Sequence, residues 1–384
     1  MNKLKILFLY ISQLPLYYLG NIIPKDDSIW IFGSWFGIKY ADNSKSLFEH
    51  ISKKHKNIRP IWITNNQKIM EELQQKNYEV YKKYSIRAIF IGLRAKYSVF
   101  VHSNNADNMI FLNNKRVKKI QLWHGIPLKK IGYDDSFSKH KISRWKILLF
   151  PFLDDKIDLM ISVSNEDKLH FQSAFNVSKE FIFSTGYPRN DALFTSNKKH
   201  TFKVTYLPTF RDDIGSQIDL FSEYDFKLDE WNSKLPKMGI LFDIKMHPVN
   251  KPKDEVLKRF SDTDNILFLN EVDVSEILPE TDILITDYSS VYFDFLLTDK
   301  PIIFAPFDYD KYITKDRELY YDYNEVTPGP KCQNWGEVLQ WIEKFKNDST
   351  LYSDERKKIK DRFHEYQDGN SCERVYNELI NMDK

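Results

Sequence analysis

The sequence has few cysteines, no large excess of charge of either sign and no repeated segments. The 384 residues include two cysteines, Cys332 and Cys372, which are too few for a disulfide framework and lack metal-ligand spacing. A reducing compartment is therefore the simplest expectation. The 56 basic residues nearly balance the 54 acidic residues, so no overall basic excess points to a nucleic-acid partner. No internal repeat or low-complexity segment is visible.

A long uninterrupted hydrophobic run is also missing, although residues 4–23 are mostly apolar and aromatic. Polar residues and a proline interrupt this stretch at Lys5, Ser12, Gln13, Pro15 and Asn21. No small-residue cleavage site follows it, so neither a signal peptide nor a clean membrane-spanning helix fits. We expect an anchor that lies in the membrane interface, with a helix packed on the first domain and a true span as the alternatives.

The chain has the composition of a globular protein, with 42% apolar and 29% charged residues, and its length suits two domains. Short apolar runs alternate with stretches of helical spacing such as 46–54, 69–75 and 85–93. This alternation predicts parallel sheets with right-handed crossovers in an α/β protein. The expected strands are 29–32, 59–64, 97–102, 118–123, 159–164, 203–207, 242–246, 265–269, 282–286 and 301–304.

A turn-rich connection at residues 186–199 divides this series into two halves. We therefore predict two doubly wound Rossmann-like domains, residues 27–195 and 196–384, preceded by a membrane-associating segment at residues 1–26. Ligands bind at the carboxyl ends of the strands in open parallel sheets. The predicted active site accordingly lies in the cleft between two facing sheets.

The most informative segment is 121–132, in which His124 falls just after a predicted strand. An imidazole with an ordinary pKa near 6.5 accepts a proton at neutral pH and can act as a general base. Gly125 lets the chain turn close to a substrate, and Pro127 and Lys129 are expected beside the same substrate. A histidine that only completes a loop hydrogen bond is the alternative, but the neighbouring glycine, proline and lysines favour the functional interpretation.

A second histidine, His247, follows an apolar strand in the second half of the chain, close to Lys245. A histidine that is cationic or donates a hydrogen bond suits a diphosphate, whose leaving group gains negative charge as the bond breaks. We expect His247 to be the partner of His124, and Lys245 to contact the same diphosphate.

A strand end that leads into hydroxyl residues marks segment 286–294. Thr286 and Asp287 precede Ser289 and Ser290, and a helical stretch follows. The free N–H groups at a helix N-terminus favour a phosphate, and the serine hydroxyls can add donors. Simple helix capping is the alternative, and the position at a strand tip favours phosphate binding.

Two polar loops carry arginines that could clamp phosphate or pair with a neighbouring aspartate. Arg211 lies in the loop 208–213 together with Thr209, and we expect both residues to help bind phosphate. Arg189 lies in the loop 186–191, whose sequence also fits an interdomain turn, and we place it in the cleft.

Five motifs of this chain, taken in order, resemble those of the CDP-glycerol glycerophosphotransferase family, which includes teichoic acid primases and polymerases. The resemblance extends over nearly the whole chain. The motifs are Trp-His-Gly-x-Pro-Leu-Lys-Lys at 123–130, Gly-Tyr-Pro-Arg-Asn-Asp at 186–191, Pro-Thr-Phe-Arg-Asp at 208–212, Lys-Met-His at 245–247 and Thr-Asp-Tyr-Ser-Ser-Val-x-Phe-Asp at 286–294.

The resemblance implies a GT-B fold in which the second domain holds a CDP-activated polyol and the acceptor enters from the first. His124 would deprotonate the acceptor hydroxyl, and His247 would assist the donor pyrophosphate while CMP leaves. Ser289 and Ser290 would hold phosphate, with Arg211 as a further contributor. The expected donor is CDP-glycerol or another CDP-polyol, and no bound cofactor or metal is expected.

The acceptor implied by the resemblance is a lipid-linked glycan or a polyol phosphate at the cytoplasmic face of the membrane. Residues 137–152 fit such a place, because basic side chains precede a block of bulky apolar ones that could enter a membrane surface. A core helix with a solvated basic face is the alternative.

Two other functions remain open at this point. One is a nucleotide-sugar glycosyltransferase or epimerase of the same fold, because the fold does not determine the transferred group. The other is a non-catalytic glycan-binding protein at the membrane. The motif set argues against the first, and the presence of both His124 and His247 argues against the second.

Overall fold

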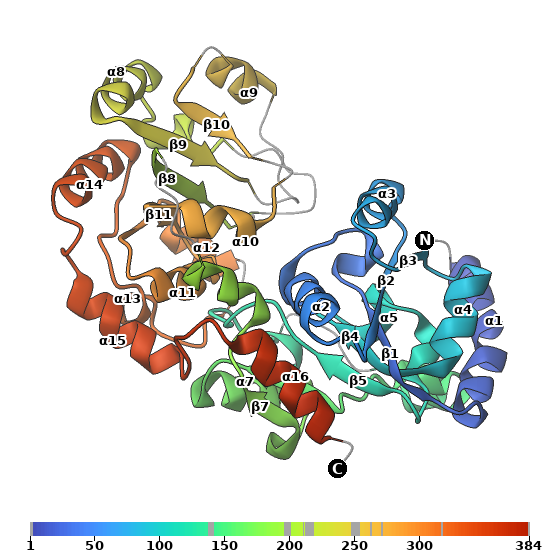
Figure 1. Ribbon diagram of the computed structural model, residues 1–384. Helices are drawn as coiled ribbons and strands as arrows, with labels where there is room; N and C mark the ends of the chain where they lie inside the picture. Colours follow the sequence, from blue (N-terminus) through green and yellow to red (C-terminus); the bar gives the residue numbers. More distant parts are fainter. Residues whose placement is uncertain are drawn as a thin grey trace. The chain divides into compact units, whose positions relative to one another are not determined.

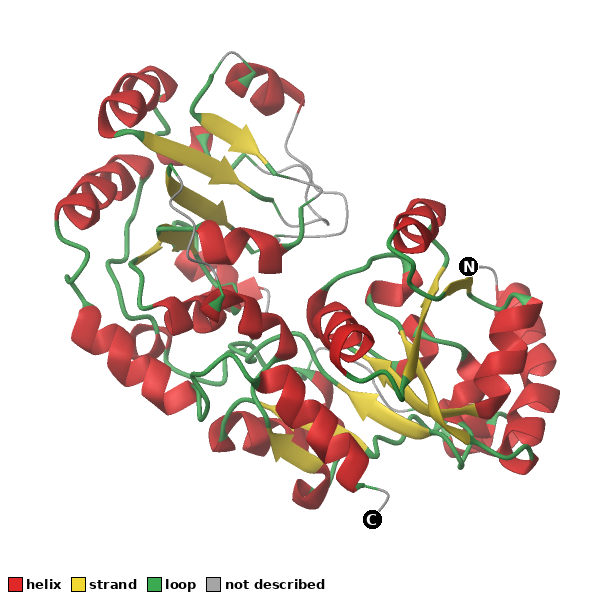
Figure 2. Ribbon diagram, in the orientation of Figure 1, coloured by secondary structure: helices red, strands yellow, loops and turns green. Residues whose placement is uncertain are grey.

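The chain forms two units, each built around its own parallel sheet (Figures 1 and 2). The computed structural model describes residues 3–136, 142–195, 201–209, 211, 219–246, 254–261, 263–269, 272–315 and 318–382. Unit 1 comprises Met1–His124, Ser138–Asp191 and Asn370–Lys384. Unit 2 comprises Gly125–Phe137 and Ala192–Gly369.

The sheet of unit 1 has the strand order β3-β2-β1-β4-β5-β6-β7, and all its described pairings are parallel. Apolar runs form these strands because helices cover both faces of a doubly wound sheet. The order reverses direction between β1 and β4, which defines a topological switch point. The strands are β1 (Asp26–Phe32), β2 (Arg59–Thr64), β3 (Val80–Lys82), β4 (Ala95–Phe100), β5 (Lys118–Gln121), β6 (Leu159–Ser162) and β7 (Ile182–Ser184).

The helices of unit 1 begin where polar residues can satisfy free backbone N–H groups. The Ser85 side chain accepts a hydrogen bond from Ala88 N at the start of α4, and the Ser164 side chain caps α7 in the same way. The helices are α1 (Lys3–Ile22), α2 (Asp42–Lys54), α3 (Gln67–Gln75), α4 (Ile86–Arg94), α5 (Asn104–Asp107), α6 (Arg144–Leu149), α7 (Asn165–Phe175) and α16 (Ser371–Asn381).

Unit 2 repeats the same topology with five strands in the order β10-β9-β8-β11-β12, so its switch point lies between β8 and β11. The strands are β8 (Phe202–Leu207), β9 (Ile240–Ile244), β10 (Ile266–Phe268), β11 (Ile283–Thr286) and β12 (Ile302–Phe304). The helices are α8 (Leu228–Met238), α9 (Asp254–Phe260), α10 (Val274–Ile277), α11 (Val291–Phe295), α12 (Tyr309–Lys315), α13 (Tyr323–Val326), α14 (Trp335–Asn347) and α15 (Ser353–Phe363). Buried aromatic rings from α8, α14 and the strands, including Trp231, Trp335 and Tyr206, form its core.

The N-terminal segment is a helix, α1, that packs on unit 1 with one face. Tyr17 is 5% exposed and joins the core that includes residues of β1, β2 and the short 3₁₀ helix Ile110–Asn113. This face of α1 therefore matches the alternative prediction of a helix packed on the first domain. No helix among the described residues has both the length and the apolar character needed to cross a membrane.

The contact units differ from the predicted domains in three ways. Helix α1 belongs to unit 1 rather than to a separate segment. The chain passes into unit 2 at Gly125–Phe137, well before the predicted junction. It then returns at residue 370, and α16 packs against α2 of unit 1 (Figure 1). Long-range packing of this kind leaves no local mark in a sequence.

Candidate active site

His124 lies three residues beyond the end of β5, where the backbone turns sharply. Trp123 has a φ of 51° and Gly125 a φ of 143°, and the second value lies in the left-handed region that favours glycine. The imidazole is half-buried and stacks on His102 with 4.6 Å between ring centroids. The sharp turn at the strand tip therefore holds the His124 ring against an aromatic neighbour.

One hydrogen bond determines which nitrogen of His124 carries the proton. Nδ1 lies 3.3 Å from the carbonyl oxygen of Val101, which can only accept, so the neutral ring carries its hydrogen on Nδ1. Nε2 is left with the lone pair. Burial, followed by the charge of His102, lowers the pKa of His124 to about 4. The ring is therefore neutral at pH 7 and has the form of a general base.

His102 and Asp107 belong to the same site but were missed by the sequence reasoning. His102 Nδ1 lies 3.6 Å from Asp107 Oδ1, and the Asp107 carboxylate also accepts backbone N–H bonds from Phe36, Val101 and His102 at 2.8–2.9 Å. Burial alone would raise the pKa of Asp107, but the interactions with His102 and these N–H groups lower it. The available signal for His102 was a histidine at the last position of the predicted strand 97–102.

Arg189 pairs with an aspartate in the described structure. Its Nη1 donates to Asp42 Oδ1 at 2.7 Å, and its backbone N–H donates to the Asn43 side chain at 3.1 Å. Burial raises the pKa of Asp42, but the charge of Arg189 and the backbone N–H of Asn43 lower it below its ordinary value, and the charge of Asp42 in turn raises the pKa of His124. Asp42 therefore belongs to the electrostatic environment of His124, and Arg189 holds it in place.

The residues that follow His124 belong to unit 2. Gly125 and Pro127 are buried, and Lys129 forms an isolated antiparallel bridge with Leu319. Lys129 Nζ also lies 4.9 Å from the centre of the Tyr312 ring. The motif 123–130 is thus divided, because the histidine is part of unit 1 and the lysines are part of unit 2.

At the switch point of unit 2, Arg211 cross-links the loops that follow β8 and β11. It is 5% exposed, and it donates to Asp287 Oδ2 at 2.7 Å and to both carboxylate oxygens of Asp308 at 2.7 and 3.0 Å. A fourth bond reaches the carbonyl oxygen of Thr209 at 2.7 Å. Arg211 was predicted either to bind phosphate or to pair with an aspartate. These contacts show the pairing with aspartates.

Asp287 is the centre of this network. Its Oδ1 accepts the backbone N–H of Thr209 at 2.8 Å and that of Tyr288 at 2.6 Å. Within the described residues the Thr209 hydroxyl is buried and has no hydrogen-bond partner. Because buried hydroxyls are normally bonded, this one is a candidate contact for a ligand.

The hydroxyl groups after β11 divide into two kinds. The Thr286 hydroxyl donates to the carbonyl oxygen of Leu207 at 2.7 Å and so joins β11 to β8. Ser289 and Ser290 are half-buried, and Ser289 Oγ accepts a long bond of 3.4 Å from Val291 N. The helix expected after them is α11, which has five residues, and Ser290 precedes it without a side-chain cap. The serine hydroxyls, rather than a long helix dipole, are therefore the groups available for a phosphate.

The remaining predicted residues, Lys245 and His247, follow β9 in the sequence. Lys245 follows this strand, and its Nζ lies 3.5 Å from the carbonyl oxygen of Leu269. His247 lies outside the described residues, so its predicted role stays a prediction.

Known proteins match this chain over nearly its whole length. A teichoic acid glycerol-phosphate transferase of Staphylococcus aureus is 28% identical over 92% of this chain and 92% of its own length. A teichoic acid poly(glycerol phosphate) polymerase of Bacillus spizizenii is 28% identical over 98% of this chain and all of its own length. The structure of the wall teichoic acid polymerase TagF superposes with a TM-score of 0.77 at 22% identity, covering 100% of this chain and 98% of that chain.

The two doubly wound units and the likeness to TagF show a GT-B-like fold. Residues 16–381 match the family described as CDP-glycerol:poly(glycerophosphate) glycerophosphotransferase, and the chain belongs to that family. A UDP-N-acetylglucosamine 2-epimerase shares the fold at a TM-score of 0.53 and 14% identity, over 94% of this chain and 97% of that chain. That second likeness shows the fold alone, whereas the family match argues against the epimerase alternative.

Proposed function

We propose that this protein transfers glycerol phosphate from CDP-glycerol to a hydroxyl group of a teichoic acid or related polyol-phosphate acceptor and releases CMP. The observation that carries the proposal is the state of His124, a neutral imidazole with its Nε2 lone pair available in a chain of this family. The experiment that tests the proposal is the transfer of labelled glycerol phosphate with equimolar release of CMP.

In the proposed step, the acceptor oxygen forms a bond to the phosphorus that carries glycerol. The bond between this phosphorus and the bridging oxygen breaks, and CMP leaves with that oxygen. His124 Nε2 takes the proton of the acceptor hydroxyl, so that the attacking oxygen gains nucleophilicity as the bond forms. The charge of Asp42 favours the His124 imidazolium that results, and Asp107 interacts with the neighbouring His102.

In unit 2, the donor phosphates are assigned to the hydroxyl groups at the β8 and β11 tips. Thr209, Ser289 and Ser290 supply the hydroxyls, and Arg211 with Asp287 fixes the loops that present them. Lys245 and His247 are the positive or proton-donating groups proposed for the departing CMP.

Replacing Ser289 and Ser290 together by alanine is expected to weaken CDP-glycerol binding by about 1.5–3 kcal/mol, because two hydroxyl donors to a charged phosphate are lost. Cytidine binding should change much less. The matched control is Thr286→Val, which removes a hydroxyl that is bonded to Leu207 instead. Calorimetry with both ligands measures the difference, and an equal loss for cytidine would move these serines to the base pocket or to a role in folding.

The proposed acceptor is linked to a lipid, which places the enzyme on the cytoplasmic face of the membrane. The outward face of α1 carries exposed apolar side chains at helical spacing, with Leu4 72% and Phe8 75% exposed. Contacts bring two more helices with exposed apolar residues beside it. Helix α4 contacts α1, and Phe150, just after α6, packs its ring on Tyr10 at 5.3 Å.

These exposed groups form the proposed membrane-binding face. Residues 137–141 lie outside the described residues, but Arg144 and Lys146 of α6 are exposed and can meet anionic headgroups. The face is defined by its exposed apolar residues Leu4, Leu7, Phe8, Ile11, Ile86, Phe90, Trp145, Leu148 and Leu149.

The double substitution of Leu4 and Phe8 by serine is expected to weaken binding to anionic vesicles by at least about tenfold, because two large apolar side chains no longer enter the interface. Point substitutions are preferable to deletion of α1, since deletion would uncover the core around Tyr17. Leu169→Ser on α7 is the control, because Leu169 is exposed on a helix that contacts β6 and β7. Vesicle sedimentation that gave the same binding for all three proteins would refute the assignment.

A further inference from the structure

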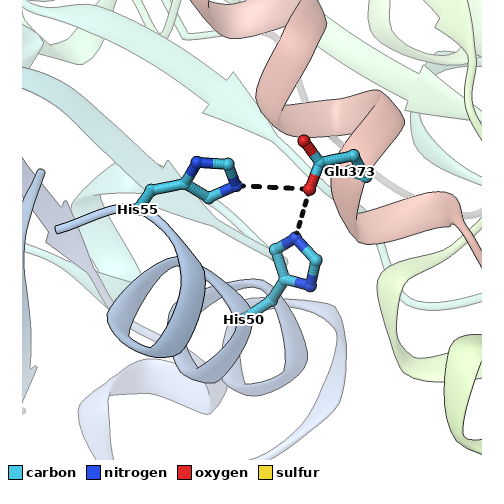
Figure 3. Close-up of side chains that lie close together, drawn as sticks. All are labelled: His50, His55 and Glu373. Atoms are coloured by element: carbon cyan, nitrogen blue, oxygen red, sulfur yellow. Dashed lines mark hydrogen bonds and ion pairs between the residues drawn. The ribbon is translucent and has the colours of Figure 1, made fainter. Parts of the chain in front are cut away.

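A cluster of two histidines and one glutamate joins α2 to α16 in unit 1, apart from the groups assigned to catalysis (Figure 3). His50 lies within α2, His55 is the residue directly after α2, and Glu373 lies in the first turn of α16. His50 Nε2 and His55 Nε2 lie 2.8 and 3.2 Å from the same oxygen, Glu373 Oε2. Figure 3 shows the two rings directed at this oxygen from different sides.

The surroundings hold these groups in place. The imidazole of His55 stacks on the ring of Tyr376, one turn along α16 from Glu373, with 3.5 Å between centroids and 17° between planes. The histidine side chains are 14% and 15% exposed, whereas Glu373 is 40% exposed. The three groups are therefore positioned by packing, and the carboxylate gives solvent ions access.

We propose that His50, His55 and Glu373 bind one zinc ion, with water in the fourth position. The three ligand atoms lie within 4.8 Å of one another. Tetrahedral Zn²⁺ with bonds of about 2.0–2.1 Å separates its ligands by about 3.3 Å, so small side-chain shifts suffice to admit the ion. In the metal-free protein, hydrogen bonds to the carboxylate occupy that place.

The donor set selects the kind of metal. Imidazole nitrogens suit zinc and other first-row transition ions, whereas magnesium and calcium prefer all-oxygen sites. Two histidines and one carboxylate with an open position are a ligand set that zinc uses.

The place of the site in the fold indicates a structural role. Residue 370 is where the chain returns from unit 2 to unit 1, and α16 follows directly. The Asp191 carboxylate accepts the N–H groups of Ser371 and Cys372 at 2.8 Å, and Tyr97 donates to the Leu379 carbonyl oxygen at 2.9 Å. A zinc ion would add a covalent-like link between α2 and this terminal helix, whose residues are more than 300 positions apart in sequence.

The test is titration of the full, metal-stripped protein with Zn²⁺ alone, followed by calorimetry and elemental analysis. The expected result is one zinc ion per chain. Glu373→Gln keeps the size and an acceptor oxygen but loses the charge, and should lower the affinity by at least about tenfold, since even outer-shell changes cost that much. Glu378→Gln on the same helix and His124→Asn in the active site are the controls, and both should still bind one ion.

Two further measurements show whether Glu373 is a metal ligand or only a structural contact. Co²⁺ in place of zinc should give the strong visible absorption of a tetrahedral site in the wild-type protein and lose it in Glu373→Gln. Zinc should raise the melting temperature of the wild-type protein and of Glu378→Gln, but not that of Glu373→Gln. Absence of stoichiometric binding, or the same affinity in Glu373→Gln, would overturn the proposal and leave a hydrogen-bonded contact between α2 and α16.

Discussion

His124→Asn is expected to fold like the wild-type protein and to lower the rate of glycerol phosphate transfer by at least about a hundredfold. An asparagine amide can still donate to the Val101 carbonyl, as Nδ1 does, but it has no counterpart of Nε2 and cannot take the proton of the acceptor. Steady-state transfer assays measure the rate, and circular dichroism checks the fold. His170→Asn on α7 is the matched control and should keep normal activity.

The pH dependence of kcat/KM is a second test of the role of His124. Burial lowers the pKa of His124 to about 4, so the base stays neutral as the pH falls from 8 to 5. We expect protonation of His124 to lower kcat/KM near pH 4 and not near pH 6.5. Near-normal turnover of folded His124→Asn would contradict the role of His124 as base.

The second large effect is expected on stability. Arg211→Ala should lower the free energy of unfolding by about 3–5 kcal/mol, because it leaves the buried carboxylates of Asp287 and Asp308 without their cation. Denaturant unfolding measures this loss. Lys227→Ala is the control, since Lys227 pairs with Asp225 on the surface, where such pairs contribute little. A change below about 1 kcal/mol for Arg211→Ala would contradict the account of Arg211 as a cross-link.

The sign of the pH effect follows from Asp308. Burial, the largest influence, raises its pKa, but the hydrogen bond and charge of Arg211 outweigh burial and lower the pKa below the ordinary value. The stabilisation is therefore present above the unfolded pKa of about 3.9 and is lost as the pH falls through the lowered pKa. The difference between wild type and Arg211→Ala should shrink accordingly in acid.

Much of the fold could be predicted because parallel strands that are buried on both faces are continuous apolar runs. β1, β2, β8 and β11 overlap the predicted strands closely. The strands β3 (Val-Tyr-Lys) and β7 (Ile-Phe-Ser) were missed because neither is a continuous apolar run, whereas the equally short β10 and β12 are. The family and its GT-B fold followed from five ordered motifs.

Site residues could be predicted only where a reactive side chain lies at a strand tip. His124 and the segment after β11 carry that signal, and so does His102, which is not among the predicted site residues. The pairing of Arg211 with Asp308 joins residues 97 positions apart, and that of Arg189 with Asp42 joins residues 147 positions apart. A sequence shows each arginine but not its partner, which is why phosphate and aspartate both remained open as partners.

The most direct test of the account is a donor panel of CDP-glycerol, CDP-ribitol and UDP-N-acetylglucosamine, each incubated with purified protein and a polyol-phosphate primer. The account predicts CMP release from CDP-glycerol, matched one to one by glycerol phosphate in the product and lost in His124→Asn. Turnover of the UDP-sugar, or no CMP release from CDP-glycerol by folded protein with primer present, would contradict it.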